Sequence, residues 1–251
     1  LFEESGPEGA TKDIDAALGG AIGNLINDGE TKGELNELTL LHSLGNIPSP
    51  RILIVGLGKK ENLDIKKVKD ISASSLRYLR RLGITNVTTV LHGVNESNYS
   101  SEECAQAITE GALMGLYRFD RHKKSSDKNG SIEKLFLAVG TEDDPDKIKS
   151  AIDRGSVIAK AVNNTRDLGN EPANFLTPTD MSERAYDLAS GTCLDCEILQ
   201  KDEIESLGMG AFLGVAAGST QEPKFIILRY TGLPSSDSGI ALIGKGITFD
   251  S

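Results

Sequence analysis

Apolar runs typical of β-strands alternate with amphipathic helical patterns along the first 143 residues, and this alternation limits the fold more than any other feature. A helical pattern over 13–27 and a strand-like run over 38–42 come first. Strand-like runs and helical patterns then follow one another in the order 51–55, 65–82, 86–91, 100–117 and 132–139. Strands joined by helices of this length favour parallel βαβ connections. We therefore predict the α/β fold class, with an α/β/α sandwich over residues 1–143.

A second part of the chain begins near residue 143. The helix-start signal Glu142-Asp143-Asp144-Pro145 precedes a helical pattern over 146–168, which is too long for a simple crossover. We interpret this helix as a connector between two domains, 1–143 and 144–251. The patterns beyond it predict a helix, a strand, a second helix and a strand at 180–189, 193–199, 201–207 and 224–230.

The last twelve residues contain the main candidates for chemistry. The unbroken apolar run Ile240-Ala241-Leu242-Ile243 predicts a strand buried on both faces, as in a covered parallel sheet. Gly244 and Gly246 would then hold Lys245 at the end of this strand, with Asp250 five residues later. Ligands of open α/β sheets bind beyond the carboxyl ends of the strands, so Lys245 and Asp250 are candidate site residues.

Two other interpretations of this stretch are open. From Gly239 the sequence is one residue short of a phosphate-binding loop, but its four middle residues belong in a strand, and Gly246 replaces the hydroxyl that binds magnesium. That interpretation is therefore disfavoured. The simpler alternative is that Lys245 and Asp250 form a solvated ion pair at a strand end.

Two segments resemble a known family. Gly244-Lys245-Gly246-Ile247-Thr248-Phe249-Asp250-Ser251 resembles the opening of the metal-site signature of the leucyl aminopeptidase family, the two-metal peptidases. Residues 163–178, with Arg-Asp-Leu, Asn-Glu-Pro-Ala-Asn and Thr-Pro in this order, resemble the start of that family's catalytic domain. The resemblance covers essentially the whole chain. It implies a macro-domain-like α/β/α sandwich followed by the beginning of an α/β/α metallopeptidase domain.

The resemblance also implies a function. It predicts a metalloaminopeptidase of leucine type that releases amino acids from peptides with a free N-terminus, with Lys245 and Asp250 as metal ligands. Two divalent ions (Zn, Mn or Mg) per complete subunit would act as Lewis acids on the carbonyl and on a bridging water. The family is typically a homohexamer. Its catalytic domain continues past Ser251, so we expect the catalytic residues downstream, and we expect this chain to be an inactive fragment that also lacks the family's first strand.

Composition excludes other classes. With 27 basic and 37 acidic residues the net charge is −10, which argues against nucleic acid and anionic membranes as partners. No apolar stretch approaches the roughly 18 residues of a membrane helix. Three cysteines, an odd number, favour reduced thiols and a cytoplasmic location. Cys193 and Cys196 have metal-site spacing, but residues three apart on a strand face opposite sides, so we predict buried core cysteines.

A different class of function rests on the N-terminal domain alone. It could serve as a non-catalytic binding or assembly module, with a nucleotide-type pocket beyond Val55-Gly56-Leu57-Gly58. However, Glu61 stands where a dinucleotide-binding loop has its third glycine, so the same residues favour a tight turn between a strand and a helix.

Overall fold

The computed structural model describes residues 1–94, 99–124, 130–232 and 239–248. They divide into two compact units, Leu1–Arg166 and Asp167–Ser251. The predicted domain boundary at residue 143 stays a prediction, because a division by compactness and a domain boundary need not coincide. The N-terminal unit contains the elements α1 (Gly9–Ala17), α2 (Ala21–Asn27), β1 (Leu38–His42), β2 (Arg51–Val55), η1 (Lys60–Asn62), α3 (Ile65–Arg81), β3 (Asn86–Val90), α4 (Ser101–Gly115), β4 (Lys134–Ala138) and most of α5 (Pro145–Asn170).

The strands of the N-terminal unit form two pairs. β1 and β2 are antiparallel, with Leu38 opposite Val55, because the short loop between them permits only a hairpin. β3 and β4 are parallel, with Asn86 opposite Lys134. α4 lies between these two strands in the sequence, so the predicted parallel connection through a helix is confirmed.

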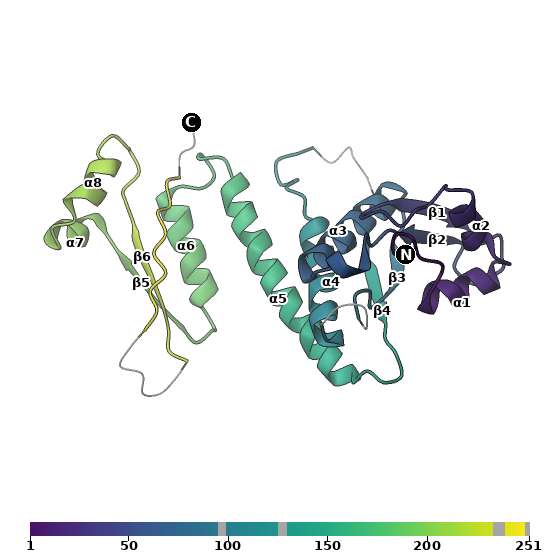
Figure 1. Ribbon diagram of the computed structural model, residues 1–251. Helices are drawn as coiled ribbons and strands as arrows, with labels where there is room; N and C mark the ends of the chain where they lie inside the picture. Colours follow the sequence, from purple (N-terminus) through teal and green to yellow (C-terminus); the bar gives the residue numbers. More distant parts are fainter. Residues whose placement is uncertain (95–98, 125–129, 233–238, 249–251) are drawn as a thin grey trace. The chain divides into compact units, whose positions relative to one another are not determined.

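The core of the N-terminal unit lies where α3 packs on α4 (Figure 1). Val68 of α3 and Ile108 of α4 are fully buried in one apolar cluster. A Cβ atom at Gly111 would lie 2.2 Å from the carbonyl oxygen of Lys69, so only glycine permits this approach of the two backbones. The close helix pair is therefore fixed by a small residue as well as by apolar ones.

Helix ends in this unit follow local sequence signals. The Asp64 carboxylate accepts a hydrogen bond from the amide of Lys67 at the start of α3, and Ser100 forms a capping box with Glu103 at the start of α4. The predicted single helix over 13–27 is wrong, since α1 and α2 are separate. Gly19 and Gly20 have φ values of +66° and +86°, which an α-helix cannot contain.

The C-terminal unit contains α6 (Pro178–Ala189), β5 (Leu194–Leu199), α7 (Lys201–Ser206), α8 (Gly210–Ala216) and β6 (Phe225–Tyr230). β5 and β6 form an antiparallel ribbon beside α6, with Leu194 opposite Tyr230 (Figure 1). No helix in the described ranges has the length and apolar character needed to cross a membrane.

The strand predicted at Ile240–Ile243 is wrong in this structure. These residues have no strand conformation, and the side chains of Ile240, Leu242 and Ile243 are 94–95% exposed. A β-strand exists only where a neighbour completes its hydrogen-bond ladder, and none of the described strands pairs with this segment. An apolar run predicts that a strand is buried, but it does not show which strand pairs with it.

Candidate functional site

Lys245, the first predicted metal ligand, lies in an exposed segment with neither helix nor strand. Asp250, the second, lies outside the described residues, together with Phe249 and Ser251. The structure therefore does not bring the two predicted ligands together, and their pairing stays a prediction.

The described residues do not by themselves fit a metal pair. Within the described ranges, no group of three or more His, Cys, Asp or Glu side chains is arranged to hold an ion. Lys245 adds only a single exposed amine. Two-metal chemistry needs several anionic ligands around two ions. The described residues alone therefore do not make up a two-metal site.

Cys193 and Cys196 do not add a metal site among the described residues. Cys193 is exposed and Cys196 half-buried, so the prediction of buried core cysteines is wrong for this pair. Cys193 precedes β5, and Cys196 lies on β5 opposite Leu228 of β6, in a ribbon of only two strands. Such a ribbon cannot bury both of its faces within itself.

Residues 163–178, the segment with the more extended resemblance, are well ordered. In its first part, Asn163 and Arg166 of α5 donate side-chain hydrogen bonds to the carbonyl oxygens of Leu113 and Met114, at 3.1 and 2.9 Å. The guanidinium of Arg166 also lies 4.1 Å from the ring centre of Tyr117. The last carbonyls of α4 lack partners within their own helix, so these donors complete its C-terminal end.

The middle of this segment contains an ion pair whose carboxylate is buried. The Glu171 side chain is 1% exposed, and its carboxylate lies 3.8 Å from the Arg184 guanidinium of α6. A buried carboxylate is stable only with such partners, so this pair fixes how the turn after α5 meets α6. The amides of Phe175 and Leu176 both donate to the carbonyl oxygen of Pro172. Hydrogen bonds within the chain therefore hold the turn that follows α5.

The end of the segment starts α6. Thr177 and Asp180 form a capping box, in which the Thr177 amide donates to the Asp180 carboxylate at 2.8 Å and the Asp180 amide donates to the Thr177 hydroxyl at 3.3 Å. Hydrogen bonds from the Thr177 side chain and amide lower the pKa of the Asp180 carboxyl. Pro178 at the first helical turn needs no amide partner.

The loop after β2 has its backbone amides bonded to other parts of the chain. The amides of Gly56, Leu57 and Gly58 donate to the carbonyl oxygens of Glu37, Leu1 and Gly33, at 2.8–2.9 Å. A phosphate-binding loop needs free amides that point to the ligand. These amides are already bonded within the chain, so the loop does not offer them to a phosphate. The tight turn and the nucleotide-type pocket at this position stay predictions.

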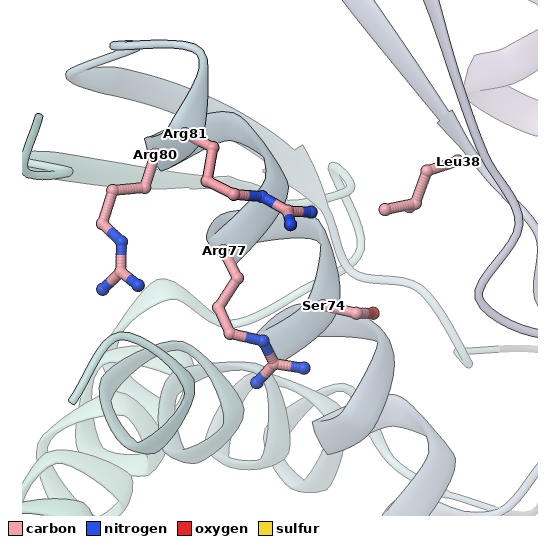
Figure 2. Close-up of a pocket in the computed structure, with 5 residues that line it drawn as sticks. All are labelled: Leu38, Ser74, Arg77, Arg80 and Arg81. Atoms are coloured by element: carbon pink, nitrogen blue, oxygen red, sulfur yellow. The ribbon is translucent and has the colours of Figure 1, made fainter. Parts of the chain in front are cut away.

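Sequence reasoning missed a cavity on α3. Its volume is about 330 Å³, and it is lined by Leu38, Ser74, Arg77, Arg80 and Arg81 (Figure 2). The available signal was charge spacing. Arginines at positions i, i+3 and i+4 of a predicted helix lie on one face, and helices usually alternate charge signs there.

Comparison with protein-family models matches both parts of the chain. The N-terminal domain of the cytosol aminopeptidase family matches residues 1–126, and the catalytic domain of the same family matches residues 163–251. The second match includes the ordered 163–178 segment and both predicted metal ligands.

Curated relatives and solved structures agree with these matches. A probable cytosol aminopeptidase of Alkaliphilus metalliredigens is 36% identical over 240 residues, which are 95% of this chain and 48% of that protein. One from Ralstonia pickettii is 37% identical over 258 residues, covering 100% of this chain and 51% of the relative. This chain thus spans about half the length of these relatives.

The fold is shared with two solved enzymes. A variant of tomato leucine aminopeptidase has a TM-score of 0.77 at 24% identity, covering 90% of this chain and 44% of that one. The bottromycin maturation enzyme BotP, solved in complex with Mn, has a TM-score of 0.72 at 23% identity, covering 92% of this chain and 44% of BotP. The predicted α/β fold class is therefore confirmed.

Proposed function

This chain belongs to the cytosol aminopeptidase family, and on that premise we propose that it forms part of a metal-dependent aminopeptidase that releases amino acids from the N-termini of peptides. The observation that carries the proposal is the match of residues 163–251 to the family's catalytic domain. Because this chain spans about half of its relatives, the proposed activity is that of the full-length protein.

Lys245 and Asp250 are the proposed metal ligands of this chain. Asp250 offers a hard, anionic oxygen, the donor type that divalent ions such as Mn and Mg favour. Lys245 can coordinate only as the neutral amine, so metal binding must displace a proton from its ammonium group. The Mn in the BotP structure supports dependence on a divalent ion.

The finer parts of the proposal follow from the same family membership. We propose a preference for leucine-type N-terminal residues, two divalent ions per complete subunit, a homohexamer and a cytoplasmic location. The names of the relatives support the location, and the name of the tomato enzyme supports the preference. Zinc, manganese and magnesium are the candidate ions.

Substitution of the ligands in the full-length protein tests the proposal. Lys245→Ala and Asp250→Asn should each abolish hydrolysis of a leucine anilide and reduce the number of metals bound, while the melting temperature stays within a few degrees. Lys201→Ala and Asp202→Asn are matched controls, because both side chains are exposed on α7. Normal turnover in either ligand variant would remove that residue from the site.

The 251-residue chain alone provides a second test. We expect no anilide hydrolysis and only weak binding of divalent metal, because one lysine and one aspartate cannot hold two ions about 3.5–4 Å apart against water. Robust turnover, or two tightly held metals per chain, would show that the active site is placed wrongly.

A further inference from the structure

The arginine cavity of α3 has the size of a site for a small ligand. Its volume of about 330 Å³ lies at the lower end of the range for small-molecule pockets. In Figure 2 the side chains of Arg81 and Ser74 point to the side of α3 on which Leu38 of β1 lies, and Arg80 extends to the other side. The cavity thus opens between the last two turns of α3 and the first residue of β1.

The positive charges of the three arginines in this cavity are not balanced by nearby carboxylates among the described residues. Arg77 precedes Arg80 and Arg81 by three and four residues, so the like charges are neighbours on the helix and repel one another. Among the residues that the structure describes, no carboxylate lies within ion-pair distance of any of the three, although Arg118 nearby pairs with Asp120 at 2.8 Å. In a chain with an excess of acidic residues, three such arginines stand out.

The three arginines are not equivalent. Arg80 is half-buried and donates a hydrogen bond to the carbonyl oxygen of Leu116 at 2.9 Å, so it caps the end of α4. Burial, followed by the positive charges of Arg118 and Arg77, lowers the pKa of Arg80. Arg77 and Arg81 are exposed, and Arg81 is 5.9 Å from the ring centre of Tyr78. Arg77 and Arg81 therefore keep their guanidinium donors for a ligand.

Ser74 also lines the cavity, but its hydroxyl is already hydrogen-bonded within the chain. Its hydroxyl lies 2.5 Å from the Asn36 side-chain oxygen and 2.9 Å from the Asp70 carbonyl oxygen. A serine has one proton to donate, and these acceptors use it. This contact ties the turn before β1 to α3, and it fixes the wall opposite the arginines.

We propose that Arg77 and Arg81 bind a small, multiply charged anion of the phosphate class, with Arg80 adding positive charge beside them. A guanidinium fork matches two phosphate oxygens, and two forks on one helix face suit a ligand with two phosphate groups. Three full charges exceed the roughly half negative charge at the C-terminal end of α3, so the cavity stays positive. A bound anion would also cancel the repulsion among the arginines.

Titration of inorganic pyrophosphate into the 251-residue chain tests this site. By isothermal calorimetry at low salt we expect saturable binding of one pyrophosphate per chain, which weakens as salt rises. The double variant Arg77→Gln, Arg81→Gln should bind at least tenfold more weakly. The matched control Arg154→Gln, Lys160→Gln removes two exposed charges from α5 and should keep the wild-type affinity.

Several outcomes would overturn the proposal. One is the absence of saturable binding. Another is an equal loss of pyrophosphate affinity in the control variant, which would show that only the net charge of the chain matters. Tighter binding of citrate than of pyrophosphate would reject the phosphate class. Binding of duplex DNA that pyrophosphate does not displace would assign the arginines to a polymer. Ligand-free melting curves of all variants must coincide with the wild type, since every substituted side chain is on the surface or at the cavity.

Discussion

The two units of this chain bury their apolar residues to very different extents. In the N-terminal unit, α3 and α4 share a core in which Val68 and Ile108 are fully buried. In the described part of the C-terminal unit, the buried apolar residues are Leu176, Ala185, Ile204 and Pro223. Exposed apolar side chains are frequent there, and Tyr230 of β6 and Leu242 are 69% and 95% exposed.

The difference teaches where the stability of this chain resides. Burial of apolar surface is the main favourable term in folding, so the N-terminal unit should fold by itself. The contiguous apolar residues 240–243 are of the kind that mark an interaction surface or a sheet still to be covered. The proposed metal ligands Lys245 and Asp250 thus belong to the unit that is less well packed.

The largest expected effect comes from opening the core of the N-terminal unit. Ile108→Ala should lower its free energy of unfolding by about 2–5 kcal/mol, because the substitution leaves a cavity among fully buried side chains. Hydrogen exchange, monitored at increasing urea concentration, would measure the free energy of unfolding of each unit separately. Leu188→Ala on α6, where the side chain is 58% exposed, is the control and should change stability by no more than about 0.5 kcal/mol. Equal losses would mean that the two units are packed alike.

Two glycine-to-alanine substitutions, one in each unit, should change stability in opposite directions. Gly111→Ala in α4 should destabilise the N-terminal unit by about 1–3 kcal/mol, because the new methyl group collides with the Lys69 carbonyl. Gly214→Ala in α8 meets nothing within 4 Å and should stabilise its helix by about 0.5–1 kcal/mol through helix propensity. Thermal melts of both variants would check the signs. A stabilising Gly111→Ala would contradict the close approach of α3 and α4.

The matched capping boxes of α4 and α6 give a smaller effect. Ser100→Ala and Thr177→Ala each remove one side-chain acceptor, which should cost about 0.5–2 kcal/mol of helix stability. We expect Ser100→Ala to appear in the global unfolding of the N-terminal unit, because α4 lies in its core. Thr177→Ala should appear as local fraying of α6, seen as faster amide exchange in its first turn. If Thr177→Ala instead lowered the free energy of global unfolding and Ser100→Ala caused only local fraying, α6 would be part of a cooperative core.

Local signals explain which elements could be predicted from the sequence. The helix predicted at 65–82 and observed as Ile65–Arg81 has an amphipathic pattern, an Asp64 cap and Gly83 as its stop. The single helix predicted over 13–27 failed because two glycines can end a helix that the apolar spacing would continue. The strand predicted at 240–243 failed because its partner strand is not a property of its own residues.

The candidate site was predictable only through resemblance. Lys245 and Asp250 carry no pattern that distinguishes metal ligands from a solvated ion pair, and one of them lies outside the described residues. The roles of Asn163 and Arg166 in capping α4 could not be read from sequence, because their acceptors lie about 50 residues earlier. The arginine cavity depends in the same way on a long-range contact, the one between Ser74 and Asn36.

The last prediction uses a pH slope that only one unit should have. All three histidines, His42, His92 and His122, belong to the N-terminal unit. His92 is half-buried, and loss of solvation lowers its pKa, although the carbonyl oxygens of Val68 and Val90 oppose this shift. Burial disfavours the charged imidazolium, so the folded N-terminal unit prefers the neutral ring.

The sign of the slope follows from proton binding. In the unfolded chain His92 titrates near its ordinary pKa of about 6.5, and in the folded chain it titrates lower. The unfolded state thus binds more protons below pH 6.5, and the N-terminal unit should lose stability as the pH falls from 7.5 to 5.5. His92→Gln should flatten this slope, whereas His42→Gln, at an exposed position, should keep it. The C-terminal unit has no histidine, so its unfolding should be constant over this range. Urea midpoints of both units at several pH values would decide, and equal slopes in the wild type and His92→Gln would contradict the assignment.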